Sequence, residues 1–142
     1  MYDVMRALGV DYGTVRTGIA ASDPMGIMAI GVGNIKAKGL HELAQKIADA
    51  ASERECEVIV IGLPINMNGT RSDKCDTVEL LGQYISEYTD IPVEFFDERM
   101  STMVAHRYLN ATDTRGAKRK ERVDTLAAEI ILQNYLDSKR KG

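Results

Sequence analysis

Four carboxylates lie at positions where packing alone does not require a charge. Asp11 and the pair Asp97 and Glu98 directly follow apolar runs that predict strands, and Asp124 lies on the apolar stripe of a predicted helix. If these segments meet at one sheet edge, three carboxylates come together and repel one another unless a divalent cation binds between them. Ligand sets made only of oxygens favour Mg²⁺ or Mn²⁺. The pattern therefore predicts a metal site.

The second ligand of this site is ambiguous. Because side chains alternate along a strand, only one of Asp97 and Glu98 can share a face with Asp11, and the spacing allows either. Each carboxylate also has an ordinary structural interpretation. Asp11 can begin the turn at Tyr12 and Gly13, and an acidic residue near the beginning of a helix interacts favourably with the helix dipole. The metal site thus depends on whether these positions meet in the fold.

Basic residues near the carboxylates indicate a substrate that carries phosphate. Arg16 lies in the glycine-containing turn after the first strand, and Arg71 closes a polar loop, residues 63–71, that follows another strand. Residues 115–122 hold five basic residues and one acidic residue. The candidate phosphate contacts in this segment are Arg115, Lys118, Arg119 and Lys120. This run is either a solvated lead-in to a helix or a strip that contacts phosphates beside Asp124.

Length and composition exclude several classes of protein. The chain has 142 residues, 44% of them hydrophobic and 27% charged, so we expect one domain with a buried core over residues 1–142. Its net charge of −3 argues against coating nucleic acid through bulk charge but allows a local basic site. We expect a cytoplasmic protein without a membrane partner, because neither a membrane span nor a secretion signal is apparent. The P-loop and the GxGxxG motif after the first strand are absent.

The carboxylates need strands and helices to position them, and hydrophobic periodicity predicts both. The predicted strands are 4–11, 15–22, 27–35, 57–62 and 93–96, and the predicted helices are 40–54, 73–88, 101–109 and 121–138, with 110–119 irregular. Short connections predict that the first three strands are antiparallel, whereas strands joined through helices must be parallel. We therefore expect an α/β fold with a five-stranded mixed sheet flanked by helices.

Four motifs span the chain from about residue 6 to 137. They are LGVDYGTVRTGIA at 8–20, GLP at 62–64 followed by Asn68-Gly69, DERMST at 97–102, and KRK at 118–120 leading to Asp124 with AA at 127–128 and ILQ at 131–133. In this order and spacing they resemble the YqgF/RuvX family, whose members are described as Holliday junction resolvases and as pre-16S ribosomal RNA nucleases. Met100 replaces the usual leucine or phenylalanine, a change that conserves volume.

The resemblance implies an RNase H-like fold and a metal-dependent phosphodiesterase site. Its catalytic metal ligands would be Asp11, Glu98 and Asp124, with Asp97 as the alternative to Glu98. The residues that would contact phosphate are Arg16, Arg99 and Lys120. Two Mg²⁺ or Mn²⁺ ions about 4 Å apart, bridged by Asp11, would activate a water and neutralise the leaving 3′ oxygen, which releases a 5′-phosphate.

The expected activity is endonucleolytic cleavage that matures the 5′ end of pre-16S ribosomal RNA, with nucleic acid and the pre-ribosomal particle as partners. One alternative is a Holliday junction resolvase that acts on branched DNA. Another is a non-catalytic nucleic-acid-binding regulatory module, whose binding through residues 115–122 would survive metal removal. The turn at 11–14 also resembles the phosphate-binding turn of the actin and sugar-kinase superfamily, but those enzymes close two such domains around ATP. The sequence allows either a monomer or a weak homodimer.

Overall fold

The computed structural model describes residues 5–66, 68–97 and 116–140, with the backbone alone for residues 116–124 and 140. Its elements in chain order are β1 (Ala7–Asp11), β2 (Thr17–Ser22), β3 (Ala29–Ile35), α1 (Leu40–Glu53), β4 (Val58–Leu63), α2 (Lys74–Tyr88), β5 (Val93–Asp97) and α4 (Gly116–Arg140). Each predicted strand is present, and each boundary lies within three residues of its prediction. Among these described residues, no helix has the length and hydrophobicity to cross a membrane.

The five strands form one mixed sheet in the order β3-β2-β1-β4-β5. β2 pairs antiparallel with both β1 and β3, whereas β4 pairs parallel with both β1 and β5. The predicted division into an antiparallel and a parallel half is therefore confirmed. Because β1, β4 and β5 run the same way, their carboxyl ends come to the same edge of the sheet.

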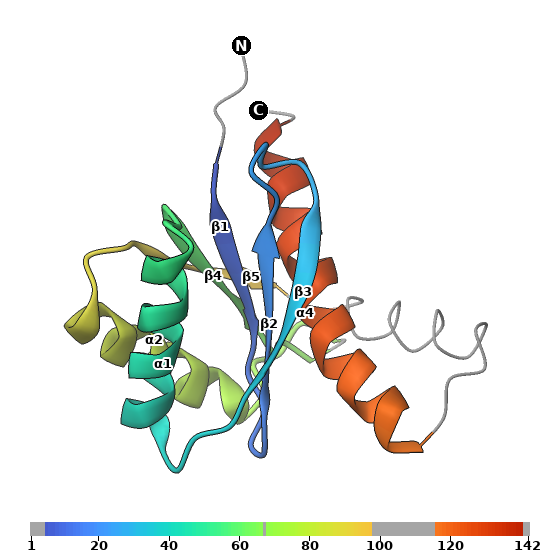
Figure 1. Ribbon diagram of the computed structural model, residues 1–142. Helices are drawn as coiled ribbons and strands as arrows, with labels where there is room; N and C mark the ends of the chain where they lie inside the picture. The colour runs from blue at the N-terminus through green and yellow to red at the C-terminus, as the bar shows by residue number, and fades with distance from the viewer. Residues whose placement is uncertain (1–4, 67, 98–115, 141–142) are drawn as a thin grey trace.

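Helices cover both faces of the sheet (Figure 1). On one face, the buried side chains of α1 and α2 pack against Leu8, Val10, Ile59 and Ile61. On the other face, α4 packs its apolar stripe against the alternate residues of the same strands. That stripe consists of Ala128, Ile131, Leu132, Tyr135 and Leu136. Both faces of the central strands are thus buried, which explains why Val58-Ile59-Val60-Ile61 is continuously apolar.

Two glycines allow α4 to approach the sheet closely. A Cβ added at Gly9 would lie 2.7 Å from the Cβ of Leu132, and one added at Gly31 would lie 2.1 Å from the Cγ2 of Thr125. Any larger residue at these positions would push the helix outward. These contacts fix where α4 crosses β1 and β3.

The last helix is longer than the sequence predicted. α4 begins at Gly116, whereas the prediction was irregular structure over 110–119 and a helix from 121. The prediction relied on apolar periodicity, and residues 116–120, GAKRK, have none. Alanine, lysine and arginine are strong helix formers, so this segment continues a helix without an apolar face. The helix predicted at 101–109 lies outside the described residues.

Candidate functional site

The candidate site lies where β1 ends. Figure 1 shows β1 running to the lower end of the view, where the β1–β2 turn and the beginning of α1 also lie. Asp11 is the last residue of β1 and is partly buried. Strand alternation places it on the same face as Ala7 and Gly9, which is the face that α4 covers. The prediction that Asp11 shares a face with small residues is confirmed.

The backbone of Asp124 lies near the same position. Ala128 contacts β1 at Gly9, two residues before Asp11, and Asp124 is one helical turn before Ala128 on the same helix face. Since α4 begins at the lower side of the view and rises as β1 descends, this turn lies toward the end of β1 (Figure 1). Helix and strand therefore bring these two predicted ligands to neighbouring places in the fold.

β5 shows which face of the sheet Asp97 shares. Phe96 faces α4, where its ring meets Tyr135 edge-on with centroids 6.2 Å apart. Phe95 faces α2 and lies against Gly82. By alternation, Asp97 shares the face of Phe95, opposite to that of Asp11. The backbone thus disfavours Asp97 as a partner of Asp11, and the next position, Glu98, lies outside the described residues.

Asn34 is a polar residue at this site that the sequence reasoning missed. It lies in β3 opposite Gly18, which in turn lies opposite Asp11, so all three share one row across the sheet. The Oδ1 atom of Asn34 is buried and accepts no hydrogen bond within the described part of the chain. A buried amide oxygen without a donor is rare, and it adds an uncommitted oxygen to the row that contains Asp11. Asparagine is depleted in strands, so its presence in a predicted strand was the sequence signal that could have identified Asn34.

The β1–β2 turn holds Arg16 beside the end of β1. A Cβ added at Gly13 would lie 2.2 Å from the carbonyl oxygen of Arg16, so the tight turn requires glycine there. The backbone N–H of Gly13 donates to the Oγ1 of Thr17 at 3.4 Å, which ties the turn to the beginning of β2. Arg16 is partly buried in a turn of defined shape. The sequence predicted this turn and the place of Arg16 in it.

Arg71 has partners within the fold. Its guanidinium donates to Asp76, at 3.3 Å, and to Glu79, both on α2. The hydrogen bond to Glu79 is the main reason that the pKa of Arg71 is raised. Contact with phosphate would require this exposed arginine to exchange those carboxylates for the substrate. Its predicted role in binding nucleic acid stays a prediction.

The other predicted site residues are placed only in part. Lys118, Arg119 and Lys120 lie in the first turns of α4, where the backbone alone is described. Arg99 and Arg115 lie outside the described residues. Among the described side chains, no group of three His, Cys, Asp or Glu residues could hold a metal ion. Glu98 and the side chain of Asp124 lie outside that set.

Sequence comparisons connect the chain with a group of nucleases. The family described as "RuvX: Holliday junction resolvase" matches residues 5–138. A relative from Heliobacterium modesticaldum is 42% identical over 95% of this chain and 91% of its own length. Relatives from Ruminiclostridium cellulolyticum and Streptococcus mutans are also 42% identical, over 94% of this chain and 94% and 98% of their own lengths. All three carry the name "Putative pre-16S rRNA nuclease".

Structural comparisons identify the same fold in distant proteins. Thermus thermophilus RuvC in complex with a Holliday junction substrate aligns with a TM-score of 0.60 and 11% identity, over 96% of each chain. The fowlpox virus resolvase in complex with Holliday junction DNA aligns with a TM-score of 0.53 and 14% identity, over 94% of this chain and 98% of that one. At such low identity these alignments establish the RNase H-like fold alone.

Proposed function

Because the chain belongs to the RuvX family of Holliday junction resolvases, we propose that it is a nuclease that hydrolyses phosphodiester bonds in precursor 16S ribosomal RNA. Relatives that cover nearly the whole chain carry the name of that activity. The observation that carries the proposal is the position of Asp11, at the end of β1 and on the face where α4 brings Asp124 near. We place this reaction in the cytoplasm, on the pre-ribosomal particle.

The oxygen donors proposed for this site suit a divalent metal ion. Asp11, Glu98 and Asp124 would supply carboxylate oxygens, and the uncommitted amide oxygen of Asn34 lies in the same row as Asp11. Oxygen donors of this kind suit Mg²⁺ or Mn²⁺. When bound, such ions lower the pKa of a coordinated water and offset charge on the leaving oxygen. We propose two ions, as the resemblance implies.

The protein's own residues position the substrate. Arg16 lies in a tight turn beside Asp11, and its guanidinium would bind a phosphate oxygen next to the bond that is cut. Arg99, Arg115 and the lysines of α4 would bind neighbouring phosphates. Their charge supplies affinity without reading sequence, so the shape of the nucleic acid selects the site.

A four-way DNA junction is the second candidate substrate. The description of the matching family as Holliday junction resolvase favours it. Both substrates present phosphates to the same carboxylates, so the chemistry at Asp11 would be the same. The choice between them requires a direct test.

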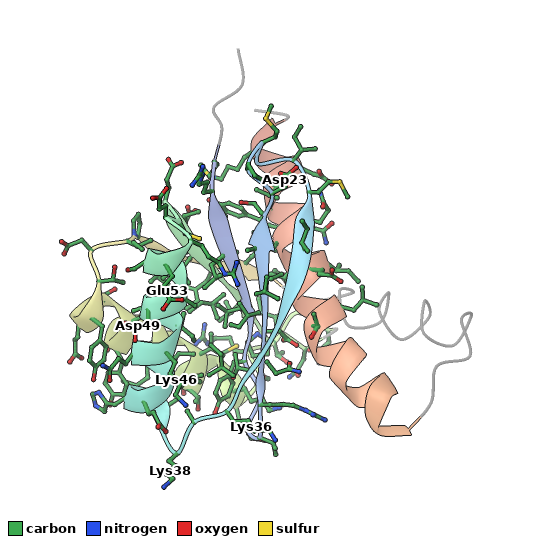
Figure 2. The ribbon with its side chains drawn as sticks, in the orientation of Figure 1. Asp23, Lys36, Lys38, Lys46, Asp49 and Glu53 are labelled. Atoms are coloured by element: carbon green, nitrogen blue, oxygen red, sulfur yellow. The ribbon has the colours of Figure 1, made fainter. Side chains whose placement is uncertain are left out.

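Cleavage of three labelled substrates tests the proposal. Purified protein is incubated with a pre-16S ribosomal RNA fragment, a single-stranded RNA and a four-way DNA junction, each in Mg²⁺, Mn²⁺ or EDTA. Asp11→Asn is the test variant. Asp49→Asn is the matched control, because Asp49 is exposed on α1 and lies away from the end of β1 (Figure 2).

We expect cutting of the precursor fragment in Mg²⁺ or Mn²⁺, with 5′-phosphate products, by the wild-type protein and by Asp49→Asn. EDTA and Asp11→Asn should each abolish it. Selective cutting of the junction would instead assign the second substrate. Cleavage by Asp11→Asn at the wild-type rate would refute the proposed site, and retention of nucleic acid without cutting would favour a binding module.

A further inference from the structure

Positive charge gathers where α1 begins. Figure 2 shows Lys36, Lys38 and Lys46 around the first turns of α1, whereas Asp49 and Glu53 lie further along the helix. All three lysines are exposed. We call Lys36, Lys38 and Lys46 the α1 basic patch. Lys36 and Lys38 precede α1, whose first turn holds Glu42. The three lysines therefore outnumber this carboxylate at the end of the molecule where β1 ends.

Two hydrogen bonds connect the residues of the α1 basic patch with one another and with Glu42. Neither bond involves the ammonium group of Lys36 or Lys38. The backbone N–H of Lys38 donates to Oε2 of Glu42 at 2.5 Å, and Nζ of Lys46 donates to the carbonyl oxygen of Lys36 at 2.8 Å. Lys46 also lies 3.8 Å from Oε1 of Glu42. Lys36 and Lys38 form no ion pair with any carboxylate in the described part of the chain. Besides the hydrogen bond from the backbone N–H of Lys38, longer-range attraction to Lys38 is among the causes that lower the pKa of Glu42. Both lysines therefore add positive charge to this surface without forming a close ion pair in the described part of the chain.

A cleft of about 170 Å³ joins the α1 basic patch to the end of β1. One wall is the β1–β2 turn from Tyr12 to Arg16, and the other is Lys38 with the first residues of α1. The cleft is smaller than the roughly 300–1,000 Å³ of pockets for small molecules, so it fits one phosphate or sugar group rather than a whole nucleotide. Tyr12 directly follows Asp11 but packs on the α1 side of the sheet, whereas Asp11 faces α4. A strand that leaves the candidate site would therefore pass around the end of β1 to reach this cleft.

Aromatic rings lie near the beginning of α1, where His41 follows Lys38 by three residues and meets two tyrosines of α2. The His41 ring stacks on Tyr84 with centroids 3.8 Å apart and planes inclined by 17°. The Tyr88 hydroxyl lies 3.5 Å from Nδ1 of His41, and 44% of Tyr88 is exposed. A basic groove next to exposed aromatic rings is the arrangement with which proteins bind single strands, because unpaired bases can stack on the rings. The bases of a duplex are already stacked and cannot do so.

We propose that the cleft, the α1 basic patch and the rings of Tyr88 and His41 bind a single-stranded segment of the substrate next to the bond that is cut. Phosphates would contact Arg16, Lys38 and Lys36, and a base would stack on Tyr88. The position of this nucleic-acid strand relative to the cut rests on the proposed nuclease site at Asp11. The substrate class that follows is a nucleic acid with an unpaired strand on one side of the cut.

Binding measurements without metal test this surface. Fluorescence anisotropy in EDTA gives the affinity for a labelled single-stranded RNA and for a duplex of the same sequence, across a range of salt concentrations. The patch variant is Lys36→Gln with Lys38→Gln. The matched control also removes two positive charges, but at the C-terminal ends of helices. It combines Arg54→Gln, directly after α1, with Lys139→Gln, near the end of α4. Thermal unfolding verifies that each variant is folded.

The patch variant should bind the single strand more weakly, and its slope of log affinity against log salt should fall by about 1.4, or about 0.7 for each lost phosphate contact. The control should keep the wild-type slope. Tyr88→Ala should weaken single-strand binding by roughly fivefold or more, whereas Tyr88→Phe keeps the ring and should bind like the wild type.

An unchanged slope in the patch variant, or equal losses for the single strand and the duplex, would overturn the proposal. These outcomes are separate from the test of the nuclease site, since no cleavage is measured. If Asp11→Asn cuts normally while the patch variant loses binding, the proposed active site is wrong and the single-strand surface stands. If the reverse holds, the nuclease stands and this surface does not.

Discussion

At the scale of single residues, the neighbours of Asp11 along β1 determine the face of the sheet on which its side chain lies. Gly9 admits α4 against the strand, with the Cβ of Leu132 and the carbonyl oxygen of Ala128 beside it. Two residues later the same face reaches the sheet edge, and there the chain has a carboxylate instead of an apolar side chain. The carboxylate therefore lies at the end of the strand, beside the turn of α4 that carries Asp124.

The same alternation makes a prediction about the second metal ligand. Asp97 shares the face of Phe95, away from Asp11, so we expect Asp97→Asn to retain cleavage within a few-fold of the wild type. Glu98→Gln should lower the cleavage rate by about 100-fold or more, because loss even of groups that support metal ligands costs 10- to 100-fold. Single-turnover cleavage rates in Mg²⁺ measure both effects. The reverse order of the two variants would show that the strand does not continue its alternation past Asp97.

At the scale of elements, α4 positions one proposed ligand and buries one face of the sheet. Its place is fixed by its apolar stripe and by close contacts with Gly9 and Gly31. Beyond this contact, Gln133 accepts from the backbone N–H of Ala29 at 2.9 Å and donates to the carbonyl oxygen of Ile27 at 2.8 Å. Glu129 accepts from the N–H of Gly31 at 2.8 Å. Helix α4 thus binds to the backbone of β3 as well as to the core.

The contact between Gly31 and Thr125 allows a test of that packing. Gly31→Ala places a Cβ 2.1 Å from Cγ2 of Thr125, so we expect it to lower the free energy of unfolding by about 1–3 kcal/mol. Thr125→Ser removes that methyl group and should restore much of the loss when combined with Gly31→Ala. Urea unfolding of the two single variants and the double variant gives the coupling energy. Additive effects would mean that α4 does not approach β3 at this point.

The β2–β3 hairpin makes a prediction about pH. The carboxylate of Asp23 accepts from the backbone N–H groups of Ile27, at 2.7 Å, and Met28, at 3.2 Å, and the bond from Ile27 is the largest cause that lowers the pKa of Asp23. A lowered pKa in the folded state stabilises the protein above the ordinary value of 3.8, and the contribution disappears as the pH falls through the folded value. Asp23→Asn should therefore lower the melting temperature at pH 7 but have less effect near pH 3. Thermal unfolding at both values measures this. An equal loss at both would show that the carboxylate charge does not matter.

At the scale of the whole molecule, the candidate site and the hydrophobic core are separate. Both core clusters fill the middle of the two faces of the sheet, whereas Asp11 and the cleft lie at the edge. We therefore expect the protein to fold without metal, because the charged residues at the edge take no part in the core. The α1 basic patch and the first turns of α4 would then flank the end of β1 from opposite faces of the sheet.

This separation predicts how metal affects stability. Mg²⁺ would bind the folded state alone. At 100 times its dissociation constant it should raise the free energy of unfolding of the wild type by about 2.7 kcal/mol, and the melting temperature should rise with it. Asp11→Asn should not respond to Mg²⁺. In EDTA this variant should be as stable as the wild type or slightly more so, because it removes a carboxylate that others repel. Differential scanning fluorimetry with and without Mg²⁺ measures both effects. A response of Asp11→Asn equal to that of the wild type would place the metal elsewhere.

The sequence by itself determined the elements and the mixed sheet. Period-two and period-3.6 patterns are local, and chain connectivity decides which strands can be antiparallel or parallel. The same local patterns placed Asp11 at the end of β1 and Arg16 in a tight turn. The pattern failed at Gly116, where a solvated helix needs no apolar stripe.

Tertiary structure alone decided which polar groups meet. The face of Asp97 followed from the packing of its neighbours on Tyr135 and α2, and Arg71 proved to pair with carboxylates of α2. Asn34 joined the row of Asp11, and Lys38 joined the cleft beside Arg16, through pairing and packing of distant segments. Such contacts depend on strand register and helix position. Strand register and helix position are determined jointly by many weak contacts across the whole core. No short stretch of sequence contains that information.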